Sequence, residues 1–341
     1  MKNPILGVTM GDPAGVGPEI IARACAEPAA RRACRPVVIG AASTMREALA
    51  LVGSALTLHG VKDVGECRWA AGALEVLDLG NVDMTALKRC EVSAAAGRAA
   101  YEYIDRAVAL ATAGAIDGIV TAPLNKEALA AAGLTHSGHT EILANLAGTR
   151  DFAMRLLGHE LRVIHVSTHV ALRRVPDLVT RERVLRTIEL AQKTLDGLGV
   201  ARGRIAVAGL NPHAGEDGLF GDEEKTAIGP AIEAARVRGM NVTGPLPADT
   251  LFSRARGGEF DIVVAMYHDQ GHIPVKTLGF NYDASTTRWV GLSGVNVTVG
   301  LPFLRVSVDH GTAFDRAWKG IANPESMIEA LDVAVRMLEH K

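Results

Sequence analysis

Short apolar runs alternate with longer amphipathic stretches along most of the chain. The run "ILGVTM" is followed by "PEIIARACAE", "RPVVIG" by "TMREALALVG", and "IDGIVTAP" by "NKEALAAAG". The short runs are apolar at consecutive positions, which is typical of strands buried on both faces of a parallel sheet. Strands that alternate with helices in this way form βαβ units. The pattern therefore predicts an α/β fold with a mainly parallel sheet covered by helices.

Three helices are indicated by their periodicity and by their end signals. Residues Ala94–Thr112 follow the N-cap candidate Ser93, and residues Arg181–Leu198 follow Thr180. A last helix is expected to open at Pro324, because proline suits the first position of a helix.

Composition and charge limit the class of protein. At about 150 residues per domain, 341 residues are enough for two domains. A 48% hydrophobic content excludes a disordered chain, and a net charge of −2 without charge runs gives no sign of a nucleic-acid or membrane partner. The N-terminal apolar stretch is too short for a signal peptide and no stretch is long enough to span a membrane, so we expect a cytoplasmic protein. The four cysteines show no CxxC spacing and are expected to be reduced.

Polar residues follow several of the apolar runs. "ILGVTM" leads into "GDP", "LRVIHVST" into His169, "RIAVAGL" into "NPH", "FDIVVAMY" into His268, and "LRVSV" into "DHG". Ligands of parallel sheets bind outside the carboxyl ends of the strands. The polar residues are therefore expected to collect along one edge of the sheet.

Three of these strand ends carry a histidine, namely His169, His213 and His268. Imidazole is the commonest neutral ligand of zinc-like cations, and the three residues are too far apart in the sequence for a local zinc finger. They suit a metal site assembled from separate strands, with open positions for a substrate. The alternative is that each histidine only caps the loop that follows it. His165 lies inside an apolar run, and we interpret it as a core residue.

A second constellation, "SGHTEILANLAG", places His139 and Thr140 at the start of a predicted helix. The backbone N–H groups, the hydroxyl and the imidazole would form a cradle for a phosphate or carboxylate, although a simple N-cap explains the same residues. Lys276 and Arg305 are candidates to neutralise an anionic substrate, or else are solvated charges. Asp249 is a candidate acid or base, or only the cap of the helix that follows it.

The first glycine-rich segment, "GDPAGVGPEI", lies between a predicted strand and a predicted helix. Its glycines, Gly11, Gly15 and Gly17, do not have the GxGxxG spacing, so a Rossmann dinucleotide motif is not indicated. We interpret the segment as a tight glycine turn beside a cofactor or substrate.

Seven motifs resemble, in this order, the 4-hydroxythreonine-4-phosphate dehydrogenase family of vitamin B6 biosynthesis. They are "GDPAGVGPEI", "SGHTE", "GLNPHAGE", "GPLPADTLF", "MYHDQG", "GVNVTVGLPF" and "SVDHGTA", and they span almost the whole chain. "HGTAFD" is also similar to the adenosine-side loop of the isocitrate and isopropylmalate dehydrogenase group. The resemblance implies oxidation of a phosphorylated hydroxy acid with NAD, after which the β-keto acid loses carbon dioxide.

The resemblance also implies a homodimer of two-domain α/β subunits with the active site in the cleft between the domains. Residues 1–128 and 304–341 would form one domain, and residues 129–303 the other. Each subunit would hold one divalent metal ion, with zinc favoured and cobalt, manganese or magnesium as alternatives. The partner subunit would contribute its histidine from "MYHDQG" to the metal site.

The resemblance and the pattern together assign the candidate site residues. The metal ligands would be His169, His213 and His268. The substrate contacts would be His139, Thr140, Lys276, Asn296 and Arg305. The candidate catalytic groups are Lys276 and Asp249, and the candidate NAD contacts are Gly11, Asp12, His310, Gly311 and Thr312. Asp269 is expected to support the neighbouring histidine ligand.

The chain departs from the biosynthetic enzyme between "KTLGF" and "GVNVTVG", where it carries the longer segment Asn281–Ser293. It lies within the stretch Gly279–Gly294, which has no clear helical or strand pattern, and we expect a functional loop or hairpin there. Together with "DQGHIPVK" it favours the paralogous branch that acts on 4-phospho-D-threonate or 4-phospho-D-erythronate rather than on 4-phosphohydroxy-L-threonine. His272 is interpreted as a neighbour of the substrate and not as a ligand, because the segment follows a strand and Pro274 argues against a helix.

Three alternatives remain open at this point. A further relative in the same family oxidises an aromatic cis-dihydrodiol carboxylate. A metal-dependent hydrolase or lyase would use the same three histidines without a nicotinamide. A phosphometabolite-binding protein on an inactive enzyme scaffold would keep the ligand positions without catalysis.

Overall fold

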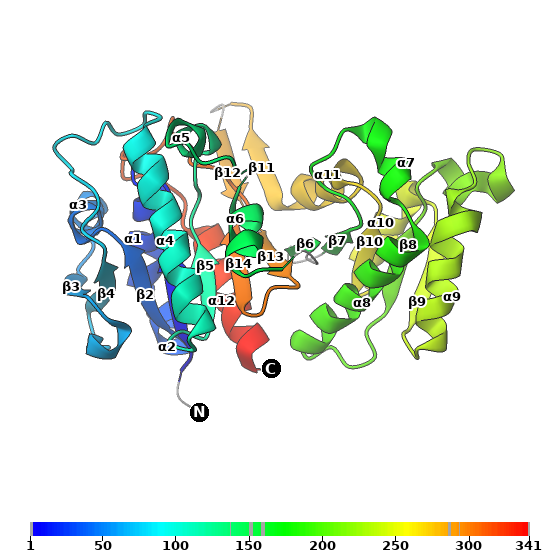
Figure 1. The fold of residues 1–341 in the computed structure, drawn as a ribbon, viewed down its shortest axis with the longest axis horizontal. Coiled ribbons are helices and arrows are strands. Elements are labelled where there is room, and N and C mark those ends of the chain that lie inside the picture. The colour runs from blue at the N-terminus through cyan, green and yellow to red at the C-terminus, as the bar shows by residue number, and fades with distance from the viewer. Residues whose placement is uncertain are drawn as a thin grey trace. The chain divides into compact units, whose positions relative to one another are not determined.

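The computed structural model describes residues 3–136, 138–149, 153–157, 161–285, 288–292 and 294–339. The chain forms two compact units. Unit 1 comprises Met1–Phe152 and Leu301–Glu339, and unit 2 comprises Ala153–Gly300 (Figure 1). The chain thus returns to unit 1 after it has completed unit 2. The first boundary follows Phe152 instead of the expected residue 128, because the helix at 139–146 packs on the helix at 94–112 of unit 1.

The described residues of unit 1 form six parallel strands. Their spatial order is β3 (Thr57–Val61), β4 (Ala73–Asp78), β2 (Arg35–Gly40), β1 (Ile5–Thr9), β5 (Gly118–Thr121) and β14 (Leu304–Val308). The central strands are buried at nearly every position, which explains their continuous apolar runs. The α/β class with a mainly parallel sheet is confirmed.

The helices of unit 1 pack in two groups. Its helices are α1 (Gly17–Ala26), α2 (Pro28–Ala33), α3 (Ala42–Leu51), α4 (Ala94–Thr112), α5 (Lys126–Ala131), α6 (His139–Leu146) and α12 (Glu325–Glu339). Helix α4 contacts α5 and α6, whereas α1 contacts α3 and α12. The predicted bounds of α4 are confirmed, and Ser93 caps it by accepting a hydrogen bond from the Ala96 N–H at 3.2 Å.

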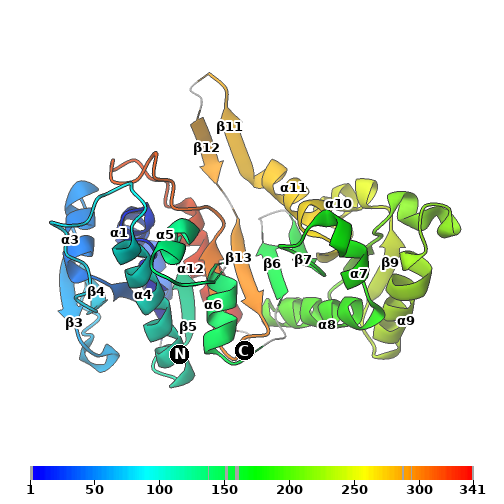
Figure 2. The ribbon, with the colours of Figure 1, turned by 45° about the horizontal axis from the view of Figure 1, so that its top comes forward.

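In unit 2, the part of the chain that the structure describes forms a second run of six strands. Their spatial order is β13 (Val295–Val299), β6 (Ala153–Leu157), β7 (Arg162–His165), β10 (Ile262–Ala265), β8 (Ile205–Ala208) and β9 (Val242–Leu246). Strand β6 is antiparallel to both of its neighbours in unit 2, and β7, β10, β8 and β9 are parallel. A separate antiparallel hairpin, β11 (Phe280–Asp283) and β12 (Arg288–Leu292), extends away from the helices of unit 2 (Figure 2).

The helices of unit 2 bury both faces of its sheet. They are η2 (Leu172–Arg174), α7 (Val175–Leu178), α8 (Arg181–Gly197), η3 (Pro212–Gly218), η4 (Glu224–Ile228), α9 (Gly229–Val237), α10 (Ala248–Arg256) and α11 (His268–Gly279). In β10, Val264 packs in a core with α8 and α9, whereas Val263 and Ala265 pack in a core with α10 and α11. Successive strand residues point to opposite faces, so both faces require apolar side chains.

The helices and strands of unit 2 test two of the expectations from the sequence. The expected hairpin in the stretch after residue 279 is confirmed, although residues 286, 287 and 293 of that stretch lie outside the described residues. The expectation that no helix follows His268 is wrong, because α11 begins at this residue and continues through Pro274. Its buried positions Gly271, His272 and Val275 pack against unit 2, and this packing outweighs the local cost of the proline.

Two further sequence predictions concern termini and cysteines. Asp249 does not cap a following helix, because α10 already begins at Ala248 after Pro247. All four cysteines are free, as expected. Among the described residues, no helix is long and apolar enough to cross a membrane.

Candidate metal and substrate sites

Three neighbouring strands of unit 2 lead to the three predicted metal ligands. Strand β10 pairs in parallel with β7 on one side and with β8 on the other, so their carboxyl ends share one edge. His169 follows β7, His268 follows β10 and His213 follows β8. These residues are far apart in the sequence, and the strand order brings the ends of their strands together.

His169 and His268 of the same chain line one cavity. Their ring centroids are 5.7 Å apart, and the cavity of about 410 Å³ is also lined by Thr168, Tyr267 and Asp269. The Nδ1 atom of His268 lies 2.6 Å from Oδ1 of Asp269. A carboxylate bound to one ring nitrogen fixes the orientation of the ring and leaves the other nitrogen for a metal. Asp269 therefore contacts the His268 ring as expected, and its support of a metal ligand stays a prediction.

Two histidines that were not predicted as ligands belong to the same cluster. The ring of His272 stacks on that of His268 with 3.6 Å between centroids and 10° between planes. The ring of buried His165 lies 4.7 Å from that of His272. Burial, with His165 and His268 nearby, lowers the pKa of His272 to about 2, so this imidazole is neutral at neutral pH. The four-residue spacing of residues 268 and 272, which is that of neighbouring side chains on a helix, was the signal in the sequence for this contact.

His213 occupies an exposed position in η3, where its backbone has a positive φ of 53°. The preceding loop is held by buried Glu224, whose Oε1 accepts hydrogen bonds from the N–H groups of Leu210 at 2.7 Å and Asn211 at 2.8 Å. Within the described part of the chain, no three side chains are grouped closely enough to hold a metal ion. The described residues thus bring the rings of His169 and His268 together.

Gln270 connects the two strand ends that lead to His213 and His268. Its Oε1 accepts the Met266 N–H at 2.7 Å, and its Nε2 donates to the Gly209 carbonyl at 2.8 Å. The Gln270 side chain therefore links the backbone that precedes His213 to the backbone that precedes His268.

The predicted catalytic groups of unit 2 do not line this cavity, although the cavity that Asp249 lines shares Tyr267 and Asp269 with it. Asp249, in the first turn of α10, lines a second cavity of about 470 Å³ together with Tyr267 and Gln270. Lys276 lies in the last turn of α11, with Nζ 5.3 Å from the ring centroid of Phe280. Asn296 lies in β13 and is half-buried. No hydrogen bond joins Asp249 to Lys276 among the described contacts.

Unit 1 brings together two of the predicted substrate contacts. Arg305, on β14, is buried, and its Nη2 donates a hydrogen bond to Oγ1 of Thr121 at 2.8 Å. Burial lowers the pKa of Arg305 to about 9, which leaves the guanidinium charged at neutral pH. Burial and the nearby Arg305 charge hold the pKa of His139 well below its usual value, and the His139 ring hydrogen-bonds with the Ala122 backbone. A cation and a neutral imidazole therefore lie side by side.

Thr140 is the second residue of α6 and is half-buried. The N-cap of α6 is Gly138, whose φ is 156°, and no described side chain caps the helix. The interpretation of Thr140 as a simple N-cap is therefore wrong, and its hydroxyl stands in the first turn, where helix N–H groups attract anions. Ser137 of the motif lies outside the described residues.

The two segments predicted to bind NAD are neighbours in unit 1. The Val16 N–H donates to the Thr312 carbonyl at 3.0 Å. At Gly11, where φ is 71°, a Cβ atom would lie 2.2 Å from the Pro123 carbonyl oxygen, so the predicted tight turn requires glycine. A Cβ atom at Gly311 would meet no described atom within 4 Å, so this glycine borders open space.

Several titratable side chains in and near the two predicted NAD-binding segments are buried. Asp12 is fully buried, its Oδ1 accepts the Ala14 N–H at 2.8 Å, and burial raises its pKa to about 6. His310 has its pKa lowered by burial. Glu19, which was not predicted as a site residue, is also fully buried, and neither of its carboxylate oxygens has a hydrogen-bond partner among the described residues.

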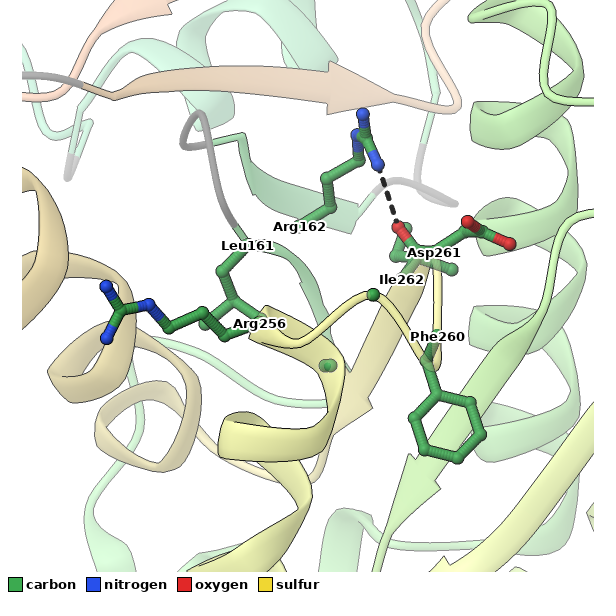
Figure 3. A pocket seen from close by; sticks show the side chains of 8 residues that line it. Leu161, Arg162, Arg256, Phe260, Asp261 and Ile262 are labelled. Carbon is green, nitrogen blue, oxygen red and sulfur yellow. Dashed lines mark hydrogen bonds between the residues drawn. The ribbon is translucent and has the colours of Figure 1, made fainter.

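A cavity of about 410 Å³ lies at the opposite edge of the unit 2 sheet, near the amino ends of β7 and β10 (Figure 3). It is lined by Arg162, Arg256, Phe260 and Asp261, and the Arg162 Nη1 donates to the Asp261 carbonyl at 3.3 Å. None of the predicted site residues lines it. The predicted metal ligands His169, His213 and His268 instead follow the carboxyl ends of β7, β8 and β10.

Comparisons with known proteins agree over the length of the chain. The sequence pattern of the family described as "Pyridoxal phosphate biosynthetic protein PdxA" matches residues 32–334. The chain is 52% identical over 329 residues to the D-threonate 4-phosphate dehydrogenase of Cupriavidus necator, and the match covers 96% of this chain and 95% of the relative.

Solved structures that are similar over nearly the full length include two dehydrogenases named for different substrates. One is a 4-hydroxythreonine-4-phosphate dehydrogenase from Klebsiella pneumoniae, with a TM-score of 0.86, 47% identity and 98% of each chain covered. The other is a terephthalate 1,2-cis-dihydrodiol dehydrogenase from Burkholderia xenovorans LB400, with a TM-score of 0.67, 30% identity and 98% of each chain covered.

Proposed function

Because the chain belongs to the PdxA family, we propose that it is a dehydrogenase of a phosphorylated hydroxy acid, with D-threonate 4-phosphate as the first candidate substrate and NAD as the oxidant. The observation that carries the proposal is the pair of imidazoles from His169 and His268 in one cavity at the carboxyl edge of the sheet. 4-Phospho-D-erythronate and 4-phosphohydroxy-L-threonine are the other candidate substrates.

His169, His213 and His268 would hold one divalent metal ion, with zinc favoured over cobalt, manganese or magnesium. The donor set fits such an ion, because the Nδ1 of His268 is engaged by Asp269 and its other nitrogen is left for coordination. When bound, the metal would polarise the substrate hydroxyl and carboxylate and stabilise the negative charge that develops there.

Side chains of each unit are candidates to contact the substrate. In unit 1, Arg305 provides a buried positive charge beside His139 and Thr140, which suits a phosphate group. In unit 2, Lys276 and Asn296 are the candidates for the remaining polar contacts. Gly11, Asp12, His310, Gly311 and Thr312 are the candidate NAD contacts.

The proposed reaction has two steps. The C–H bond of the secondary alcohol breaks and its hydride passes to the nicotinamide ring, while the hydroxyl proton is taken by a base, for which Lys276 and Asp249 are the candidates. If the new ketone lies β to the carboxylate, the C–C bond to the carboxylate then breaks with loss of carbon dioxide, and a proton returns to the carbon.

We also propose a homodimer in which the partner subunit supplies one histidine of each metal site. The proposal follows from the membership of the chain in the PdxA family, for which the family resemblance implies a shared metal site. The 5.7 Å between the His169 and His268 rings of the same chain favours the opposite arrangement, in which one subunit supplies both. The two arrangements are separable by experiment.

A panel of phosphorylated hydroxy acids, assayed for NADH and carbon dioxide together, tests the proposal. Formation of both products from D-threonate 4-phosphate is the expected result. Activity with terephthalate cis-dihydrodiol alone would favour the aromatic alternative, which the 30% identical relative makes the second candidate. Metal binding without NAD binding or NADH formation would instead favour a hydrolase or lyase.

A further inference from the structure

We infer that Thr121 is a positioning residue for the reaction, because its hydroxyl oxygen holds the guanidinium of Arg305 in the geometry that receives the phosphate end of the substrate. The inference rests on the proposed function, in which Arg305 contacts a phosphorylated substrate. None of the predicted site residues lies on β5, so the inference gives the end of this strand a role that was not predicted.

The two residues meet across adjacent strands. Arg305 of β14 is paired in register with Ile119 of β5, and Thr121 lies two positions further along β5. Side chains two residues apart on a strand point to the same face, so Thr121 is a diagonal neighbour of Arg305. The Arg305 Nη2 donates to Thr121 Oγ1 at 2.8 Å.

Both partners are shielded from water. Thr121 is 0% exposed and Arg305 is 3% exposed. A long arginine side chain has many rotamers, and a hydrogen bond to a rigid strand residue removes much of this freedom before a ligand arrives. Threonine is well suited to this position because its χ1 is restricted in a strand, so its hydroxyl is itself fixed.

The same strand end also contacts the second candidate phosphate ligand. The Ala122 backbone, next to Thr121, hydrogen-bonds with the His139 ring. Two residues at the end of β5 therefore contact two candidate ligand residues from distant segments, α6 and β14. The backbone of β5 therefore helps to set the distance between the side chains of Arg305 and His139.

The test compares Thr121→Val with Thr121→Ser. Valine keeps the shape and β-branching of threonine but removes the hydroxyl, whereas serine keeps the hydroxyl. We expect Thr121→Val to raise the KM for D-threonate 4-phosphate about tenfold, which corresponds to about 1.4 kcal/mol, with kcat, the KM for NAD and the unfolding temperature near the parent values. Thr121→Ser is expected to stay within about twofold of the parent in all four quantities.

Thr9→Val is the matched control. Thr9 is paired in register with Thr121 on the neighbouring strand β1, is equally buried, and its hydroxyl has no hydrogen-bond partner among the described residues.

A double variant supplies a second check. If Thr121 acts through Arg305, Thr121→Val adds no further rise in KM in an Arg305→Met background.

Several results would overturn the inference: an unchanged KM in Thr121→Val, an equal rise in Thr9→Val, an equal rise in Thr121→Ser, or an additive effect in the Arg305→Met background. If Thr121→Val does not fold, the comparison of Thr121→Ala with Thr121→Ser takes its place. A parent protein that forms no NADH would contradict the proposed function instead. In that case calorimetric Kd values for D-threonate 4-phosphate with the parent, Val and Ser forms decide the inference alone.

Discussion

Asp12 is a fully buried carboxyl group whose pKa is raised from 3.8 to about 6 by burial. In the folded protein it therefore keeps its proton at pH values where the unfolded chain has lost it. Its contribution to stability is fully present below about pH 4 and is lost as the pH rises through about 6.

Asp12→Asn is expected to remove this pH dependence, because asparagine does not titrate and its side-chain oxygen can still accept the Ala14 N–H. The free energy of unfolding of the variant, minus that of the parent, should rise by about 2.4 kcal/mol between pH 4 and pH 7. Urea unfolding of both proteins across this range measures the difference. A difference that is constant with pH would show that Asp12 titrates normally.

The histidines show which residues a sequence can and cannot identify. His169, His213 and His268 were predicted because each follows an apolar run, and the ends of strands are visible in the sequence. His165 and His272 were not predicted as part of the cluster, since an interior histidine and one near a proline look unremarkable alone. Their 4.7 Å ring separation depends on how α11 packs against β7, which is a tertiary contact.

At the scale of elements, the loop before His213 depends on Glu224, which lies at the start of η4 and is buried. Glu224→Ala would leave the Leu210 and Asn211 N–H groups without their acceptor. We expect a loss of about 2–4 kcal/mol in the free energy of unfolding and weaker metal binding, because unpaired buried donors are costly.

Denaturant unfolding and titration with Co²⁺, followed by its visible absorption, measure the two effects. Glu233→Ala is the control, since Glu233 is exposed on α9 and pairs only with Arg236 in the described contacts. Equal losses in the two variants would contradict a specific role for Glu224.

Most elements were visible in the sequence because their signals are local. The cap at Ser93 and the apolar run of β5 depend on residues within a few positions of each other. Helix α11 was missed because its local signal, Pro274, opposes a helix. Gly271 allows the close packing that offsets this cost, since a Cβ there would lie 2.6 Å from Val163 Cγ1.

At the scale of the whole molecule, a mixed dimer tests how the metal site is shared. One subunit carries His169→Ala and the other His268→Ala, and each homodimer is expected to be inactive. If His268 acts across the interface, the mixed dimer keeps one intact site and regains roughly half of the parent activity per dimer. If each subunit uses its own His169 and His268, both sites are broken and no activity returns.

The arrangement of strands could not be predicted from the sequence alone. The alternation of strands and helices predicted the α/β class, but the placement of β10 between β7 and β8 is set by long-range pairing. That placement decides which strand ends share an edge. The extent of unit 1 likewise depends on the packing of α6 against α4, which has no local signature.

We propose that this chain oxidises D-threonate 4-phosphate with NAD by means of a metal held by histidines. The most direct measurement uses protein stripped of metal, with NADH and carbon dioxide recorded before and after Zn²⁺, Co²⁺ or Mn²⁺ is added. We predict no NADH before addition, and NADH and carbon dioxide in equal amounts afterwards, with no recovery in a His169→Ala variant. Full activity of the stripped protein, or no NADH from D-threonate 4-phosphate with any of the metals, would contradict the claim.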